Sequence, residues 1–119
     1  MASEKSRPKR ALIIITKPPY AFEHPLGGLY TALALVDEGV KASVLLVEDG
    51  VYCVLRGQRG GKVSFEDLLY TAHASGVEVL VLNESLKSRG LSKELLSEVC
   101  KVVDDLDGVV EGCDHILCY

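Results

Sequence analysis

Three short runs of apolar residues, nearly free of polar side chains, constrain the fold of this chain most strongly. They are Ala11 to Ile15, Val44 to Val47 and Val77 to Leu82, and Glu78 is the one charged residue among them. A strand with one solvated face alternates apolar and polar side chains, whereas a strand covered on both faces is apolar throughout. Because β-branched residues also favour strands, the runs predict central strands of a parallel sheet.

The segments between and after these runs carry the periodicity and stop signals of helices. Leu29 to Glu38 is apolar almost all round and ends at Gly39, and a second helix begins at Ser64 and ends at Gly76. Other predicted elements are a short helical turn at 51–57, helices at 83–90, 92–99 and 104–111, and strands at 102–103 and 115–118. Since strands and helices alternate, right-handed crossovers predict one α/β domain with a five-stranded, mainly parallel sheet covered on both faces.

Charge divides the chain into a short arm and a body. Residues 1–10 carry four basic residues and one acidic residue, a net charge of +3, so the total of −4 leaves −7 for residues 11–119. A basic tail of this size is typically solvated, and the acidity of the body opposes phosphate groups. We therefore predict a disordered arm at 1–10, one domain at 11–119 and no direct contact with nucleic acid.

The sequence shows no sign of a membrane segment or of a nucleotide site. A helix needs about 20 apolar residues to span a bilayer, and the apolar runs are far shorter. The charged N-terminus is not followed by an apolar segment of signal-peptide type, so a cytoplasmic location is the default prediction. Neither a phosphate-loop Lys-Ser/Thr pair nor a Gly-x-Gly-x-x-Gly motif is present, and no cofactor is predicted.

A thiol just beyond a predicted strand is the first candidate for chemistry. The strand Val44–Val47 ends at an acidic turn that includes Asp49 and Gly50, and a short apolar helical pattern follows it. On a helix, Cys53 would point about 150° away from the apolar residues of that pattern. Ligands of open parallel sheets bind beyond the carboxyl ends of the strands. The sequence therefore predicts Cys53 as an accessible thiol, either the catalytic one or a cysteine of an interface or of the surface, with Asp49 and Gly50 as crevice residues.

The connection after the first strand is a second candidate region. Residues 16–25 contain three prolines, which exclude a helix there, and long connections at the carboxyl edge of a sheet often bind ligands. This loop holds Tyr20, Phe22 and His24. Gly27 and Gly28, at the head of the next helix, would leave free backbone N–H groups that suit an anion. We predict Tyr20, His24, Gly27 and Gly28 as binding residues of the crevice.

The other cysteines are predicted to be structural. Cys118 lies in an apolar strand and should pack in the core, Cys100 should be half-buried at the edge of its helix, and Cys113 should be exposed near the start of the last strand. Cys113 and Cys118 flank His115, which suggests zinc. A strand of this length holds the two sulfurs on the order of 15 Å apart, whereas Zn–S bonds are about 2.3 Å long. No metal site is predicted.

Three segments resemble the DsrE/DsrF/DsrH family, also named the TusD/TusC/TusB family of sulfur-relay proteins. They are Val47–Val51, Leu82–Leu91 and Cys113–Leu117, and the likeness extends in the order of elements over nearly all of residues 11–119. The resemblance implies a small, three-layer, flavodoxin-like α/β domain that assembles into trimers or hexamers. It also implies a part in passing sulfane sulfur between cysteines.

One departure from the family pattern bears on function. In the branch that carries sulfur, a cysteine ends the third strand, just before a helix that closes with Arg-Gly. This chain has Arg89-Gly90 but places Leu82 or Asn83 where the cysteine would stand. The resemblance therefore places the chain closer to the DsrF/TusC and DsrH/TusB branches, which act as companion subunits.

Three functions remain open on these grounds. The first is a companion subunit of a sulfur relay, in a homo-oligomer or with sibling chains, that shapes the cleft of a partner or meets a sulfur-acceptor protein. The second is an active sulfurtransferase that uses Cys53, whose thiolate the neighbouring Glu48 and Asp49 disfavour. The third is a small-molecule binder that uses Gly27, Gly28 and the 16–25 loop. The apolar first helix and an exposed region at 52–54 favour self-assembly.

Overall fold

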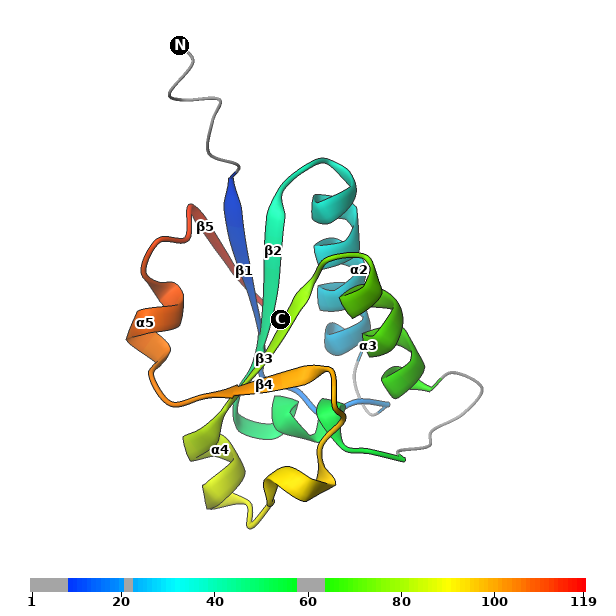
Figure 1. Cartoon of the computed structure of the whole chain (residues 1–119), viewed down its shortest axis with the longest axis vertical. Helices are drawn as coiled ribbons and strands as arrows, with labels where there is room; N and C mark the ends of the chain where they lie inside the picture. Colours follow the sequence, from blue (N-terminus) through cyan, green and yellow to red (C-terminus); the bar gives the residue numbers. More distant parts are fainter. Residues whose placement is uncertain (1–8, 21–22, 58–63) are drawn as a thin grey trace.

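The computed structural model describes residues 9–20, 23–57 and 64–119, which form a five-stranded sheet with helices around it (Figure 1). The order of the strands across the sheet is β4-β3-β2-β1-β5, and every neighbouring pair is parallel. The predicted α/β class and five-stranded sheet are confirmed. The strands are β1 (Arg10–Ile15), β2 (Lys41–Leu46), β3 (Glu78–Leu82), β4 (Cys100–Val103) and β5 (His115–Cys118).

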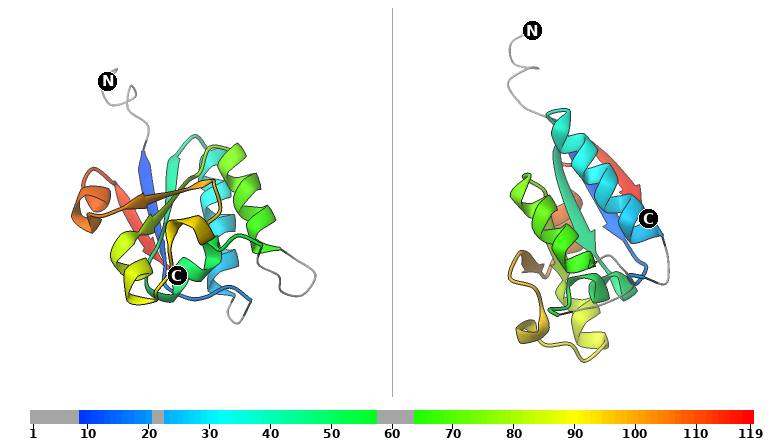
Figure 2. Two further views of the ribbon diagram at one scale, coloured as in Figure 1. Left: turned by 60° about the horizontal axis from the view of Figure 1, so that its bottom comes forward. Right: turned by 90° about the vertical axis from the view of Figure 1, so that its right-hand side faces the viewer.

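The helices are unevenly divided between the two faces of the sheet. Helices α2 and α3 lie side by side on one face, while the shorter α5 packs on the other (Figure 1, Figure 2). The 3-10 helix η1 and the short α4 start directly where β2 and β3 end. The bounds are α2 (His24–Asp37), η1 (Glu48–Val54), α3 (Phe65–Ala74), α4 (Asn83–Ser88), η2 (Lys93–Leu95) and α5 (Leu106–Val110).

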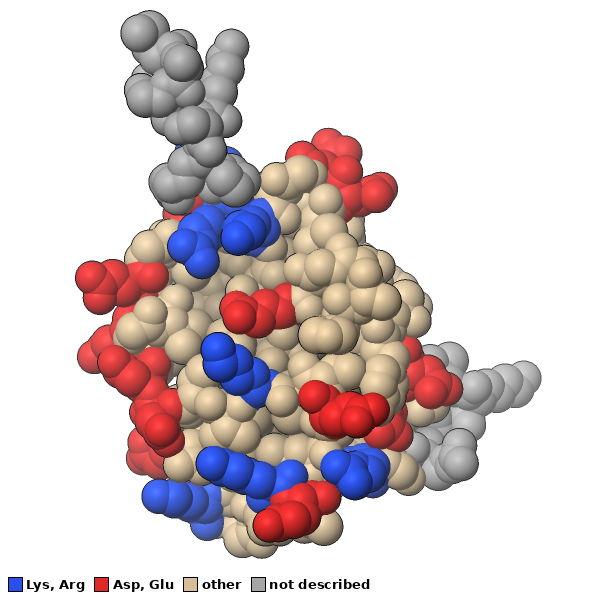
Figure 3. Space-filling model, viewed as in Figure 1, with Lys and Arg blue, Asp and Glu red and all other residues tan. Residues whose placement is uncertain are grey.

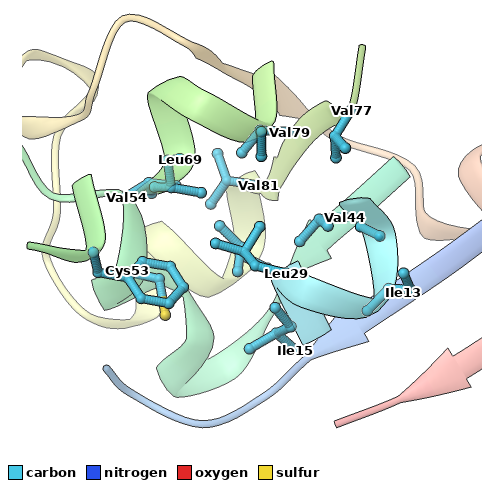
Figure 4. Close-up of a cluster of buried hydrophobic side chains, with 14 of the residues drawn as sticks. Ile13, Ile15, Leu29, Val44, Cys53, Val54, Leu69, Val77, Val79 and Val81 are labelled. Carbon is cyan, nitrogen blue, oxygen red and sulfur yellow. The ribbon is translucent and has the colours of Figure 1, made fainter. Parts of the chain in front are cut away.

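Successive side chains of each strand enter two different cores. Ile13 and Ile15 of β1 pack in a large core with Leu29 of α2 (Figure 4), whereas Leu12 belongs to a smaller cluster that α5 covers. Strand side chains alternate between the two faces of a sheet, so an uninterrupted apolar run is what a strand buried on both faces requires. This is the physical reason that the three apolar runs predict the sheet correctly.

Helix α2 begins at His24 and not at Leu29, where the sequence places its start. Pro25 lies in its first turn, where the missing N–H of a proline has no intrahelical partner to lose. The expectation that the prolines exclude a helix as far as Pro25 is therefore wrong at its last two residues.

The helix expected at 92–99 is also wrong. Only Lys93–Leu95 form a 3-10 turn, and the backbone then runs into β4. The Ser97 N–H donates to the Val54 carbonyl at 2.7 Å, and Leu55 and Leu96 form an antiparallel bridge. These bonds to the end of η1 use backbone groups that a helix would need for itself.

The start of the sheet falls inside the predicted arm. β1 begins at Arg10, and the Lys41 N–H donates to the Lys9 carbonyl at 2.8 Å. Residues 1–8, for which a disordered arm is predicted, lie outside the described residues, as does Phe22. Among the residues that the structure describes, no helix combines the length and the apolar character needed to cross a bilayer.

Candidate functional site

The turns that follow β2 and β3 meet at the carboxyl edge of the sheet. The first turn leads into η1 and begins at Glu48, whose φ of 50° lies in the left-handed region that residues other than glycine rarely adopt. The Glu48 N–H donates to the Oγ atom of Ser85 in α4 at 3.0 Å, and Ser85 is buried. This bond ties the turn after β2 to the helix after β3.

An ion pair joins the same two turns at the surface. Arg89 donates from Nε and Nη2 to Asp49 Oδ1 at 3.1 and 3.0 Å. Its Nη1 atom also donates to the Ser85 carbonyl at 3.3 Å and to Ser88 Oγ at 3.0 Å. Exposed ion pairs contribute little stability, so the main effect of these bonds is to hold the guanidinium in one orientation above α4.

Gly50 brings the turn unusually close to the first strand. Its N–H donates to the Val47 carbonyl at 2.8 Å, and the Val47 N–H donates to the Ile15 carbonyl at 3.1 Å. A Cβ atom at position 50 would overlap the Ile15 carbonyl group. Only glycine fits here, so the close approach of the turn to β1 explains why the predicted crevice residue at position 50 is a glycine.

A cavity of about 410 Å3 opens between these turns and α5. Its lining combines four apolar side chains with two carboxylates, two hydroxyl groups and one guanidinium. Its size is in the usual range for small-ligand sites. The lining residues are Ile14, Val47, Glu48, Leu82, Glu84, Ser85, Ser88, Arg89 and Leu106. We call this cavity the edge crevice.

The edge crevice can bind a group but lacks the residues for sulfur transfer. None of its lining residues is a cysteine or a histidine. Without a histidine, its serine hydroxyls also lack the base of a Ser–His pair. Among the described residues, no group of three or more His, Cys, Asp or Glu side chains is placed to hold a metal ion.

Ser85 allows a direct test of the tie between the two turns. Ser85→Ala would leave the Glu48 N–H without its acceptor, at a residue whose backbone is already strained, and we expect a loss of about 1–2 kcal/mol in the free energy of unfolding. The matched change Ser88→Ala, on the exposed side of α4, should cost less than about 0.5 kcal/mol. Urea denaturation measures both, and equal effects would contradict this account.

The structure contradicts the prediction that Cys53 is accessible. Its side chain is 0% exposed and lies in the core beside Leu29, Val54 and Leu69 (Figure 4). Its Sγ donates to the Lys17 carbonyl at 3.7 Å, and burial raises the pKa of the Cys53 thiol far above its usual range. The prediction assumes one buried helical face, but η1 is a 3-10 helix covered by α3, α4 and β2.

Cys118 is the exposed thiol instead, which corrects the prediction that it packs in the core. It lies at the carboxyl end of β5, and β5 is an edge strand whose four residues are all exposed. Cys100 is half-buried, as predicted, and burial raises the pKa of its thiol. Cys113 is also half-buried rather than exposed, and its Sγ donates to the Val109 carbonyl at 3.4 Å.

The loop and glycine residues predicted for the crevice lie on the other side of the sheet. The Tyr20 hydroxyl accepts the Phe65 N–H at 2.9 Å, so it serves the start of α3, and His24 is the exposed first residue of α2. The free backbone N–H on which the predicted anion site at Gly27 and Gly28 depends is not present at Gly27. The Gly27 N–H donates to the Glu23 carbonyl, and Gly28 is buried where a Cβ would press on Ile15.

Of the predicted residues, therefore, only Asp49 and Gly50 belong to the turns at the edge crevice. Sequence reasoning missed Glu48, Ser85 and Arg89 as a set. The Arg89-Gly90 pair, already noted as a family motif, is the signal that could have found them. The expected exposure at 52–54 is also wrong, because Val54 is fully buried and Tyr52 is only half-exposed.

Comparison with solved structures gives the same fold. The ychN protein from E. coli matches 93% of this chain and 99% of its own with a TM-score of 0.82 and 23% sequence identity. The protein MTH1491 from Methanobacterium thermoautotrophicum, of unknown function, matches the same shares with a TM-score of 0.78 and 17% identity. At these identities, the likeness concerns the fold alone.

Sequence relatives and a family profile carry the assignment further. The uncharacterized protein MJ0989 of Methanocaldococcus jannaschii is 33% identical over 110 residues, 90% of this chain and 96% of that protein. The uncharacterized protein MK0008 of Methanopyrus kandleri is 30% identical over 110 residues, 90% of this chain and 91% of that protein. The profile of the DsrE/DsrF-like family matches residues 9–117. This chain belongs to the DsrE/DsrF-like family.

Proposed function

We propose that the chain is a companion subunit of a sulfur relay and not its sulfur carrier. The observation that carries the proposal is the end of β3, where Leu82 and Asn83 stand in place of the carrier branch's cysteine. Leu82 lines the edge crevice, and the Asn83 amide donates to Asp104 Oδ1 at 2.8 Å. Neither side chain can hold sulfane sulfur, which requires a nucleophilic thiolate.

The positions of three of the four thiols support the same conclusion. Cys53 is sealed in the core, and the half-buried Cys100 and Cys113 donate their S–H groups to backbone carbonyls. A carrier thiol must be reached by both a sulfur donor and an acceptor. The hypothesis of a sulfurtransferase that uses Cys53 therefore has no physical basis.

A companion subunit acts by binding a partner protein, so the surface available for that contact is the feature to consider. The edge crevice presents four apolar side chains together with a guanidinium that Asp49 holds in place. Such a surface suits a chain segment that flanks a partner's reactive cysteine. The partners proposed are sibling DsrE-like chains or further copies of this chain, in the reducing cytoplasm where thiols stay free.

One observation favours a second candidate function. Cys118 is exposed at the carboxyl end of β5, the same edge of the sheet at which the crevice opens. An exposed thiol at this edge would allow the chain to carry sulfur through Cys118. Cys118 does not line the crevice, which is why the companion role is preferred.

Persulfide mapping separates the two functions. The purified chain is incubated with glutathione persulfide, each cysteine is mapped by mass spectrometry, and sulfur release to cyanide is timed. A companion subunit should leave Cys53 unmodified and release sulfur no faster than glutathione persulfide itself does. Release at least about tenfold faster that is lost in Cys118→Ser but kept in Cys100→Ser would establish Cys118 as a carrier and refute the companion role.

A gain of function tests the site itself. Leu82→Cys places a thiol at the end of β3, in the crevice and where the carrier branch has its cysteine, and Lys87→Cys places one on an exposed residue of α4 that does not line the crevice. If the crevice is shaped for relay chemistry, we expect the thiol introduced by Leu82→Cys to acquire sulfur about tenfold faster than the thiol introduced by Lys87→Cys. Equal rates would count against a sulfur-relay surface here.

A further inference from the structure

A second cavity lies near the amino ends of the strands, away from the edge crevice. Its volume is about 520 Å3, a usual size for a small-ligand site, and it shares no lining residue with the edge crevice. Strands β1 to β4 line it, together with α5 and the turn that follows α5. We call it the amino-edge cavity, and its charged side chains are Arg10, Lys41, Glu78, Lys101 and Glu111.

Glu78 is the one charged residue of the three apolar runs, and it faces this cavity. It lies two residues before Leu80, and Ser43 lies two residues before Leu45; both leucines belong to the smaller core. Because alternate residues of a strand share a face, Glu78 and Ser43 lie on the α5 side of the sheet. The Ser43 Oγ atom donates to Glu78 Oε1 at 3.1 Å, which holds the carboxylate in place.

Cationic residues lie on both sides of this carboxylate. Arg10 and Lys41 pair with each other in register where β1 and β2 begin, and Lys101 of β4 pairs with Leu80. Counted along the parallel strands, Glu78 lies midway between Lys41 and Lys101, whose Cα atoms are roughly 16 Å apart. The charges of the cavity therefore follow the order positive, negative, positive, and basic and acidic side chains alternate on the surface shown in Figure 3.

The three cationic groups are available to a ligand. Among the described residues, no carboxylate lies within 4.0 Å of the side-chain nitrogens of Arg10, Lys41 or Lys101, and all three residues are exposed. Residues 11–119 carry a net charge of −7, yet cations outnumber carboxylates by three to two in this cavity. A local excess of cations in an acidic domain attracts anionic groups.

We infer that the amino-edge cavity binds a small amino dicarboxylate of the γ-glutamyl dipeptide class. Its α-carboxylate binds Arg10 and Lys41, where a guanidinium can donate two parallel hydrogen bonds, and its far carboxylate binds Lys101. Its ammonium group lies against the Glu78 carboxylate. A ligand of dipeptide length spans the distance between the two lysines. Single exposed ion pairs contribute little, but these charges act together.

The inference goes beyond the proposed function and does not depend on it. The amino-edge cavity and the edge crevice lie near opposite ends of the strands, and a ligand of this class needs no cysteine. The test below measures binding, whereas the tests of the proposed function measure sulfur. The two can therefore fail separately.

Isothermal titration calorimetry of the full chain tests the charge pattern. The probe is γ-glutamylglycine, and N-glutarylglycine is the matched compound without the ammonium group. We expect γ-glutamylglycine to bind with a Kd below about 1 mM, and N-glutarylglycine to bind at least about fivefold more weakly. Lys101→Met should weaken both ligands, Glu78→Gln should weaken only γ-glutamylglycine, and Lys87→Met, on α4 and outside the cavity, should change neither.

Cys113 reports where the probe binds, because its half-buried side chain lines the amino-edge cavity and Cys118 does not line it. Saturating γ-glutamylglycine should slow the alkylation of Cys113 by iodoacetamide and leave the rate at Cys118 unchanged. Three results would overturn the inference. They are neither heat nor protection of Cys113 at about 10 mM probe, equal affinity for the two compounds, and affinity that folded Lys101→Met and Glu78→Gln variants both retain.

Discussion

Gly50→Ala is expected to lower the free energy of unfolding by about 3 kcal/mol or more. The new methyl group would overlap the Ile15 carbonyl, which is backbone in a central strand and cannot move aside as a side chain tip can. The turn after β2 would have to shift, and the Val47–Ile15 and Gly50–Val47 hydrogen bonds would be strained with it. For a domain of this size the melting temperature should fall by roughly 10 °C or more.

The same substitution at Gly27 is the matched control. Gly27 lies within α2, and a Cβ there would meet only the Tyr119 ring at 3.4 Å, an ordinary contact. Alanine is also the better helix former by roughly 1 kcal/mol, so Gly27→Ala should leave stability unchanged or raise it slightly. Thermal melts of the two variants should move in different directions, and a harmless Gly50→Ala would show that the turn does not press on β1.

Native thiol reactivity should differ by orders of magnitude between Cys118 and Cys53. Only the thiolate reacts with alkylating agents, and Cys53 is both shielded from reagents and held protonated by the raised pKa of its buried thiol. Iodoacetamide at pH 8 should modify Cys118 in the folded protein and Cys53 only after unfolding. Mass spectrometry of samples taken at successive times gives the alkylation rate of each cysteine. Rapid alkylation of Cys53 in the folded protein would contradict the prediction and would mean that η1 opens readily.

The raised pKa of Cys53 also predicts how stability depends on pH. In the unfolded chain the Cys53 thiol ionises near its ordinary pKa of about 8.5, while in the folded chain it keeps its proton. The folded state then binds more protons than the unfolded state, so the protonated Cys53 thiol makes its full contribution to the free energy of unfolding below that pH. The contribution shrinks as the pH rises, by up to about 1.4 kcal/mol per pH unit. Urea midpoints from pH 7 to pH 10 should fall less steeply in Cys53→Ala than in the wild type.

The sheet is predictable from the sequence because its signal is local. An apolar run such as Ala11–Ile15 identifies a strand buried on both faces without reference to other elements, and the alternation with helices then fixes the class. The family likeness rests on equally local segments, such as Leu82–Leu91. Asp49 and Gly50 are predicted at the crevice because they directly follow a strand, a position that the strand alone defines.

The failures are properties that depend on which elements become neighbours. Cys118 lies in an apolar strand, and nothing in its own segment says that this strand takes the edge of the sheet. The orientation of Cys53 depends on a 3-10 helix that other elements cover on more than one side. Ser97 could not be assigned to an extended segment without knowing that Val54 lies within hydrogen-bonding distance. Local periodicity carries no information about these contacts.

The strand order has a consequence for how the chain is assembled during synthesis. β1 leaves the ribosome first, but its outer neighbour is β5, and Thr16 and Tyr119, which bond across this join, are 103 residues apart. Until β5 emerges, one side of the first strand exposes unpaired backbone groups beside apolar side chains. A nascent chain of this order therefore stays open to mispairing until β5 has been synthesised, and it is in that interval that a chaperone would have most to protect.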